Sequence, residues 1–342
     1  MNHNVLVTGR DRIAPKDLRT LAHVAEVHTI NDLRPSVNEL KHALQGCDAY
    51  LLGGDEIATA DIVDNAESLK VISCLAVGAN HFVDINAATR RGITITNTPG
   101  MLAMSSALAE LTIGHIIALR RKIVCYNNQQ KRGLRAPVMT PRLSGSTVGI
   151  IGMGKAGQST ARILVQGFGA EVIYAAPRSK AEIERELGIK RVPLEILLTT
   201  SDIVVLLCAL TEETTGLIGP REIALMKSTA VLINTASGPL VHGPAMLHAL
   251  QAGQIAGASI DDYNGHESPI VKDGQVINLT PEIFNLDDEI LLTTPYIGSL
   301  TRDSWDEMSG SATSSLMHYF QFGEAKNIVN PEFRLFDQRR KT

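Results

Sequence analysis

Apolar residues along the chain follow two alternating patterns. Short β-branched runs of four or five residues alternate with longer stretches in which apolar residues recur at helical spacing. The short runs predict strands at residues 5–8, 26–29, 49–52, 71–75 and 94–97, and again at 147–152, 171–175, 203–208, 231–234, 257–260 and 290–293. Apolar strands that alternate with helices are typical of parallel sheets covered by helices on both faces, so we expect an α/β fold.

The helical stretches suggest two series of elements joined by long helices. Helices are predicted at 15–25, 37–44 and 85–91, and a longer one at 105–122 would span roughly 27 Å. Residues 127–146 contain Pro137 and Pro141 and predict a loop or arm. A last helix at 302–322 lies between Thr301, a suitable N-cap, and Gly323, a suitable stop. The pattern leaves open whether this helix returns to the first domain, and it predicts a frayed tail over 331–342.

Composition narrows the class of protein. The 342 residues carry 32 Lys+Arg against 36 Asp+Glu, a net charge of −4, so a nucleic-acid partner is not expected. The apolar strand runs are too short to cross a bilayer, and the polar start does not resemble a signal peptide, so we expect a cytoplasmic protein without a membrane partner. The four cysteines are widely spaced, which favours buried thiols and no metal site.

A glycine-rich segment carries the clearest chemical signal. The strand at 147–152 leads into Gly152-Met-Gly154-Lys155-Ala156-Gly157 and then into a helical stretch. In a Gly-x-Gly-x-x-Gly turn the first glycine allows the tight bend, the second lets the backbone approach a pyrophosphate, and the third allows the helix to pack closely on the strand. Strand before and helix after is the context that supports dinucleotide binding, and a purely structural turn is the alternative.

The end of the following strand predicts which dinucleotide is bound. An acidic residue about twenty positions after the glycines would bond the ribose hydroxyls of NAD, but this chain has none there. Arg178, Ser179 and Lys180 offer charge and hydrogen bonds that suit a 2′-phosphate. We therefore expect NADP(H) to be preferred, with NAD possible, unless these residues are only solvated loop charges.

Several motifs in a fixed order resemble the D-isomer-specific 2-hydroxyacid dehydrogenases, which include D-lactate, glyoxylate/hydroxypyruvate and 3-phosphoglycerate dehydrogenases. They are LAVGAN at 75–80, RGITITNTPG at 91–100, AE at 109–110, SDIVV at 201–205, INTA at 233–236 and GQIAGA at 253–258. The resemblance implies a flavodoxin-like catalytic domain (1–103 plus 301–342) into which a Rossmann dinucleotide-binding domain (104–300) is inserted. Both would be doubly wound parallel sheets.

The resemblance also implies roles for single residues and an oligomeric state. Thr235 and Asp261 match cofactor-binding positions of the family, and Val77 and Gly78 match substrate-binding positions. Residues 127–146 match the arm through which the family dimerises, so the resemblance implies a homodimer.

The catalytic positions depart from the family pattern. The family uses an Arg to anchor the substrate carboxylate, a His to transfer the proton and a Glu to hold that His. Here Ser237 stands at the Arg position, Tyr296 at the His position, and His266 at the Glu position, with Glu267 next to it. A serine cannot replace a guanidinium fork, whereas a phenol can donate a proton to a carbonyl oxygen. His266 and Arg302 are further candidates for the acid/base group and the positive charge, unless both are only solvated surface residues.

These departures leave three interpretations. The first is an NAD(P)-dependent oxidoreductase that reduces a small, atypical carbonyl compound with non-standard acid/base residues. The second is a catalytically silent dinucleotide sensor or scaffold, which the loss of the usual catalytic side chains favours. The third is a non-redox use of the fold. The intact glycine loop favours the first, with a small-molecule substrate.

Overall fold

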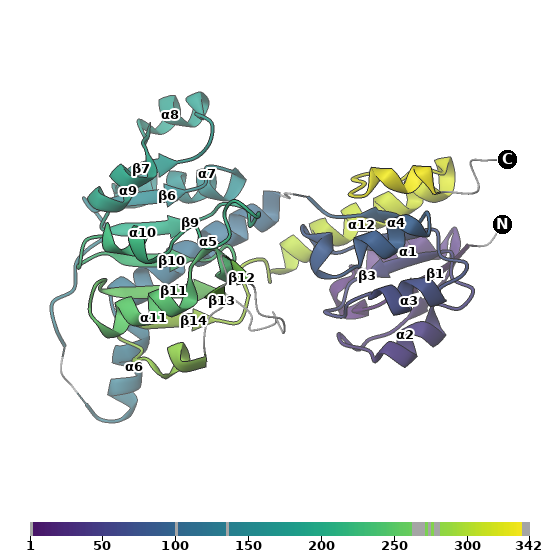
Figure 1. Cartoon of the computed structure of the whole chain (residues 1–342), viewed down its shortest axis with the longest axis horizontal. Helices are drawn as coiled ribbons and strands as arrows, with labels where there is room; N and C mark the ends of the chain where they lie inside the picture. Colours follow the sequence, from purple (N-terminus) through teal and green to yellow (C-terminus); the bar gives the residue numbers. More distant parts are fainter. Residues whose placement is uncertain are drawn as a thin grey trace. The chain divides into compact units, whose positions relative to one another are not determined.

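The computed structural model describes residues 3–99, 102–134, 137–261, 271–272, 275–276 and 281–336. The chain folds into two compact units (Figure 1). Unit 1 comprises residues 1–103 and 301–342, and unit 2 comprises residues 104–300. Each contains a parallel sheet with helices, so the predicted α/β class with two doubly wound domains is confirmed.

Unit 1 contains five parallel strands in the order β2-β1-β3-β4-β5. The strands are β1 (His3–Val7), β2 (Ala25–Thr29), β3 (Ala49–Leu52), β4 (Val71–Cys74) and β5 (Thr94–Thr96). The helices are α1 (Pro15–Ala22), α2 (Val37–Ala43), α3 (Ala60–Asn65), α4 (Ile85–Arg90) and α12 (Arg302–Phe322), with single 3₁₀ turns η1 (Arg10–Arg12), η2 (Ala79–His81) and η6 (Pro331–Leu335). The chain order reverses between β1 and β3, as in flavodoxin-like folds.

Alternation along the strands divides the core of unit 1 between two faces. Tyr50 and Leu52 of β3 pack in one apolar cluster with side chains of α2, α3 and α4. Ser73 of β4 points to the opposite face, where its hydroxyl donates to the carbonyl of Ala312 in α12 at 3.1 Å. Helix α12 also contacts α1 (Figure 1). The C-terminal helix therefore belongs to the first domain, the point that the sequence left open.

Unit 2 contains seven parallel strands in the order β14-β11-β10-β9-β6-β7-β8. The strands are β6 (Thr147–Ile151), β7 (Glu171–Ala175), β8 (Lys190–Arg191), β9 (Ile203–Leu206), β10 (Val231–Asn234), β11 (Gly257–Asp261) and β14 (Leu291–Thr294). The helices are α5 (Leu102–Arg120), which starts in unit 1, α6 (Ile123–Lys131), α7 (Lys155–Arg162) with a π-helical turn η3 (Ile163–Gly167), α8 (Ala181–Leu187), α9 (Leu194–Thr200), α10 (Pro220–Ala224) and α11 (Gly243–Gln251). A two-stranded hairpin, β12 (Val271–Lys272) and β13 (Gln275–Val276), and the 3₁₀ turns η4 (Gly238–Leu240) and η5 (Pro281–Asn285) complete the unit.

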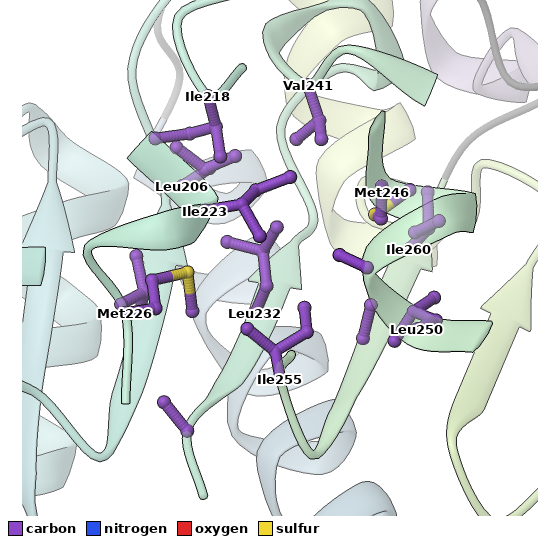
Figure 2. Close-up of a cluster of buried hydrophobic side chains, with 14 of the residues drawn as sticks. Leu206, Ile218, Ile223, Met226, Leu232, Val241, Met246, Leu250, Ile255 and Ile260 are labelled. Atoms are coloured by element: carbon purple, nitrogen blue, oxygen red, sulfur yellow. The ribbon is translucent and has the colours of Figure 1, made fainter. Parts of the chain in front are cut away.

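The apolar strands of unit 2 are buried on both faces. Leu206, Leu232 and Ile260 pack against side chains of α10 and α11, as Figure 2 shows. Val205 and Ile233 lie in a second cluster, with side chains of α5 and α7. Because neighbouring residues of one strand belong to opposite clusters, the strands read as continuous apolar runs, as expected for a covered parallel sheet.

The predicted arm is partly helical, which corrects the sequence interpretation. The long helix ends at Arg120, and α6 follows at once, so residues 127–131 are helical rather than loop. Lys122 has a left-handed φ of 53° between the two helices, and it changes the chain direction there. The predicted helix end at residue 122 lies two residues beyond the observed one, and the pattern missed α6 because residues 127–131 are all polar.

Three smaller predictions also need correction. The short elements α3, β8 and the β12–β13 hairpin were not predicted, because they are too short to show a period. The tail is ordered as far as residue 336, since η6 buries Phe333. Cys47, Cys74 and Cys125 are buried as predicted, whereas Cys208 is only half-buried.

Among the described residues, α5 is the single helix long and apolar enough to pass a length-and-composition test for a membrane span. Its side chains Ile113, Ile116 and Leu119 lie in the core of unit 2. The apolar character of α5 is therefore explained by its place in that core.

Candidate active site

The glycine loop after β6 has the geometry that its sequence predicts. Gly152 has φ = 102°, and a Cβ there would lie 2.6 Å from backbone atoms of residues 207 and 208. A Cβ on Gly157 would lie 2.3 Å from the carbonyl oxygen of Gly152. A Cβ on Gly154, the N-cap of α7, would meet no atom of the described residues within 4 Å. The first and third glycines are thus required by packing, while the second faces open space.

The start of α7 fits the pyrophosphate of a dinucleotide. The first backbone N–H groups of a helix have no partner within the helix, and they carry partial positive charge. Lys155 is exposed and Ala156 is half-buried at this start. The open backbone at Gly154, in front of these N–H groups, is the observation that makes the loop suitable for the cofactor.

The loop after β7 presents its positive charge to solvent. Arg178 and Lys180 are exposed, and the Ser179 hydroxyl donates to Glu184 of α8 at 2.8 Å. Glu184 also accepts from the Tyr174 hydroxyl, and these bonds lower the pKa of its carboxyl group. Arg191 donates to the carbonyls of residues 176 and 177, so the loop is held at its base while Arg178 extends from it.

The turn after β10 carries Thr235 and Ser237. Asn234 closes the turn, because its side-chain oxygen accepts from the amide of Ser237 at 3.2 Å and its Nδ2 donates to the Ser237 carbonyl at 2.7 Å. The Thr235 hydroxyl is buried and lies 2.7 Å from the Thr112 hydroxyl of α5. Thr112 donates to the carbonyl of residue 108, so Thr235 donates to Thr112. Its hydroxyl therefore joins the turn to α5.

Asp261 holds the turn after β14, which carries Tyr296. Its Oδ1 accepts from the Thr294 hydroxyl at 2.6 Å and from the amide of Ile297 at 2.8 Å. Its Oδ2 accepts from the amide of Gly298 at 2.8 Å. Between these anchored positions Tyr296 has a left-handed φ of 56°, and its side chain is 57% exposed.

The candidates in unit 1 lie at ends of elements. Val77 is exposed in the loop after β4, where its carbonyl accepts from the Asn97 side chain at 2.6 Å. Gly78 is the N-cap of η2. Arg302 is the exposed first residue of α12. His266 and Glu267, the other predicted catalytic residues, lie outside the described residues.

The structure also brings together residues that the sequence did not single out. Arg12 forms a forked ion pair with Asp55, at 2.6 and 3.1 Å, and its guanidinium lies 4.9 Å from the ring centroid of Trp305. His115 is buried on α5 between Ser259 and Thr294. The signal available in the sequence for this buried group was His115 itself, a single histidine inside an apolar helix. The spacing of the strands could not show that it faces Ser259 and Thr294.

Comparison with known proteins agrees with this arrangement. Residues 113–298 match the model of the "D-isomer specific 2-hydroxyacid dehydrogenase, NAD binding domain". A glyoxylate reductase of Thermococcus litoralis is 36% identical over 281 residues, which cover 80% of each chain. A glyoxylate reductase of Aeropyrum pernix is 34% identical over 331 residues and 94% of each chain. The crystal structure of the TT0316 protein from Thermus thermophilus has a TM-score of 0.78 and 31% identity, and the match covers 95% of this chain and 99% of that one.

These relatives settle the class of protein. The match spans more than half of the chain, and it includes the glycine loop, Asp261 and Tyr296. The named relatives are reductases, which supports the enzyme interpretation and gives the silent-sensor alternative no support. The chain therefore belongs to the D-isomer-specific 2-hydroxyacid dehydrogenase family, and it is a nicotinamide-dependent oxidoreductase that acts on CH–OH and C=O groups of a small molecule.

Proposed function

We propose that this protein works as a reductase of a small carbonyl compound, with NADPH as the preferred cofactor and Tyr296 as the proton donor. The observation that carries the proposal is the turn after β14. It exposes the Tyr296 side chain, while Thr294 before it and Ile297 after it are bonded to Asp261. This turn follows the carboxyl end of a parallel strand, the edge where ligands bind in such sheets.

Different residues of the chain bind the cofactor and donate the proton. The cofactor, when bound, supplies the hydride. The N-terminus of α7 and the open backbone at Gly154 bind its pyrophosphate. The Tyr296 hydroxyl donates a proton to the carbonyl oxygen as negative charge develops there. Because a phenol ordinarily has a pKa near ~10, it gives up a proton to an alkoxide more readily than it removes one from an alcohol at neutral pH. Reduction is therefore the favoured direction.

We expect that residue 237 contributes little to the binding of a substrate carboxylate. Ser237 offers one neutral hydroxyl where the family has a guanidinium fork. Glyoxylate, named for the relatives, is the first compound to test, and we expect a high KM for it and for pyruvate. Ser237→Arg should lower that KM. Rapid turnover of glyoxylate by the unmodified protein would instead point to another cation, with Arg302 as the first candidate.

A conservative variant tests the proton donor. Tyr296→Phe keeps the ring and removes the proton, so it should lower kcat for carbonyl reduction by about 10²-fold with little change in NADPH affinity. Absorbance loss of NADPH measures the first quantity, and a fluorescence titration measures the second. Full activity in this variant would reject Tyr296 and make His266 the next candidate.

The cofactor preference rests on the loop after β7. Arg178 is exposed there, and among the described residues none forms a hydrogen bond or ion pair with its guanidinium. NADPH should bind more tightly than NADH by about 1–3 kcal/mol, the usual contribution of a hydrogen bond to a charged group. Arg178→Ala should remove most of this difference, whereas Arg185→Ala on the exposed side of α8 should not. Equal affinity of the wild-type protein for both cofactors would reject the preference.

Exposed apolar residues in the arm (residues 127–146) support the proposal of a homodimer. Leu134, Val138 and Met139 are 56%, 55% and 102% exposed, respectively. The backbone of Val138 is bonded to the Tyr126 hydroxyl of α6, through its amide at 2.8 Å and its carbonyl at 3.2 Å. Exposed apolar side chains on an anchored segment suit an interface with a second copy.

A further inference from the structure

A buried chain of hydrogen bonds runs from α5 to the turn after β14. His115 is 3% exposed, its Nδ1 lies 2.6 Å from the Ser259 hydroxyl, and its Nε2 lies 3.0 Å from the Thr294 hydroxyl. Thr294 in turn contacts Asp261. The four side chains come from α5, β11 and β14, and all of them belong to unit 2.

The donors and acceptors fit one arrangement of protons. A carboxylate only accepts, so the Thr294 hydroxyl donates its proton to Asp261. Thr294 can then only accept from His115, which places the imidazole proton on Nε2. In a neutral ring Nδ1 is an acceptor, and it accepts from the Ser259 hydroxyl. The direction of donation is thus Ser259 to His115 to Thr294 to Asp261.

Burial favours the neutral ring that this arrangement requires. Desolvation lowers the pKa of His115 below its ordinary value, and the negative charge of Asp261 opposes the shift without cancelling it. The imidazole is therefore a fixed donor at neutral pH, because a ring without its charge keeps the single tautomer set by its neighbours.

The far end of the chain holds a strained turn. Asp261 accepts from Thr294 and from the amides of Ile297 and Gly298. Tyr296, between these contacts, has φ = 56°, a left-handed conformation that is strained for a non-glycine residue. Such a conformation persists only where the surroundings enforce it. The Asp261 carboxylate accepts three of the hydrogen bonds that hold this turn, beside the 3.0 Å bond from the Tyr296 amide to the Thr294 carbonyl.

We propose that His115 is a positioning residue, which acts through Thr294 and Asp261 to hold the turn at residues 295–298 and so to present Tyr296 in one orientation. The effect on catalysis rests on the function proposed above for Tyr296. The structural effect, which is to hold the turn, is independent of that function because it is measured at the amides of Ile297 and Gly298.

Amide hydrogen exchange tests the structural effect directly. His115→Phe keeps a ring of similar size, and Thr294→Val keeps the shape of the side chain, but each breaks the chain of hydrogen bonds. Both should raise the exchange rates of the Ile297 and Gly298 amides at least tenfold. Thr294→Ser keeps the hydroxyl and should leave the rates near those of the wild-type protein. Unchanged rates in His115→Phe and Thr294→Val would overturn the proposal.

A second measurement uses the unmodified protein, so it tests the proposal even if a variant fails to fold. The ¹⁵N chemical shifts of the His115 ring distinguish the neutral Nε2–H form from the Nδ1–H form and from the charged ring. At pH 7 we expect the neutral Nε2–H form. Either other form would overturn the proposal, whatever the variants do.

Kinetics then separate this proposal from the proposed function. If both hold, Thr294→Val lowers kcat about tenfold, leaves NADPH affinity unchanged and is rescued by Thr294→Ser. If Tyr296→Phe is fully active, the assignment of the proton donor is wrong, and the exchange rates and ring shifts still decide the role of His115. If Tyr296→Phe is inactive but the exchange rates do not change, the proton donor stands and the positioning role fails.

Discussion

Glu56 shows how one residue can couple the stability of unit 1 to pH. Its carboxyl group is 5% exposed, its Oε1 accepts from the hydroxyls of Thr8 and Tyr50, and its Oε2 has no hydrogen-bond partner among the described residues. Burial raises the pKa of Glu56 above its usual range. The folded state thus holds this proton more tightly than the unfolded state, so its stabilising contribution is complete at low pH and is lost as pH rises through the folded-state pKa.

Glu56→Gln removes this titration while it keeps an acceptor for Thr8 and Tyr50. Relative to the wild-type protein, the variant should gain roughly 1 kcal/mol between pH 4 and pH 7, the usual size of a single-residue effect. Trp305 is the only tryptophan and lies in unit 1, so its fluorescence follows the melting of this unit. The exposed Glu67→Gln is the control and should show no such gain. A gain that shrinks with rising pH would contradict the assigned direction.

Among the elements, the strand–turn–helix around the glycine loop contains one glycine that packing requires and one that faces open space. A Cβ on Gly157 would lie 2.3 Å from the Gly152 carbonyl, so Gly157→Ala should push α7 from β6 and cost about 1–3 kcal/mol of stability. A Cβ on Gly154 would meet no described atom within 4 Å, so Gly154→Ala should fold normally and bind NADPH more weakly. Circular dichroism melting and NADPH titration measure the two effects.

Gly167, which lies outside the glycine loop, provides the control for Gly154 and Gly157. Gly167 follows in the π-helical turn after α7, and a Cβ there also meets nothing within 4 Å among the described atoms. Gly167→Ala should change neither stability nor affinity. Wild-type NADPH affinity in Gly154→Ala would show that the open space at this position does not receive the pyrophosphate.

At the scale of the whole molecule, the exposed apolar arm predicts the oligomeric state. Light scattering should give twice the 36.9 kDa mass of one chain. Val138→Asp combined with Met139→Asp should shift the mass toward one chain, because two charges would be buried in the interface. Leu335→Asp, which changes an apolar residue of η6 that is also exposed, should leave the mass unchanged. A wild-type mass of one chain would reject the dimer.

Features that are local or periodic could be predicted from the amino-acid sequence. The apolar runs located the longer strands, the caps Thr301 and Gly323 bounded α12, and the three glycines located the dinucleotide loop. The end of the long helix was predicted within two residues, but α6 and the short elements were missed, because the second half of α6 is polar and the short elements show no clear period.

Contacts between side chains far apart in the sequence could not be predicted, because they depend on the packing of whole elements. His115 lies 144 residues from Ser259 and 179 from Thr294, and no local pattern relates them. Their contact depends on how α5 packs over β11 and β14, which the buried faces of the whole sheet determine. The same packing assigns Asp261 to the backbone of the turn after β14, a role that its position at the end of an apolar strand did not reveal.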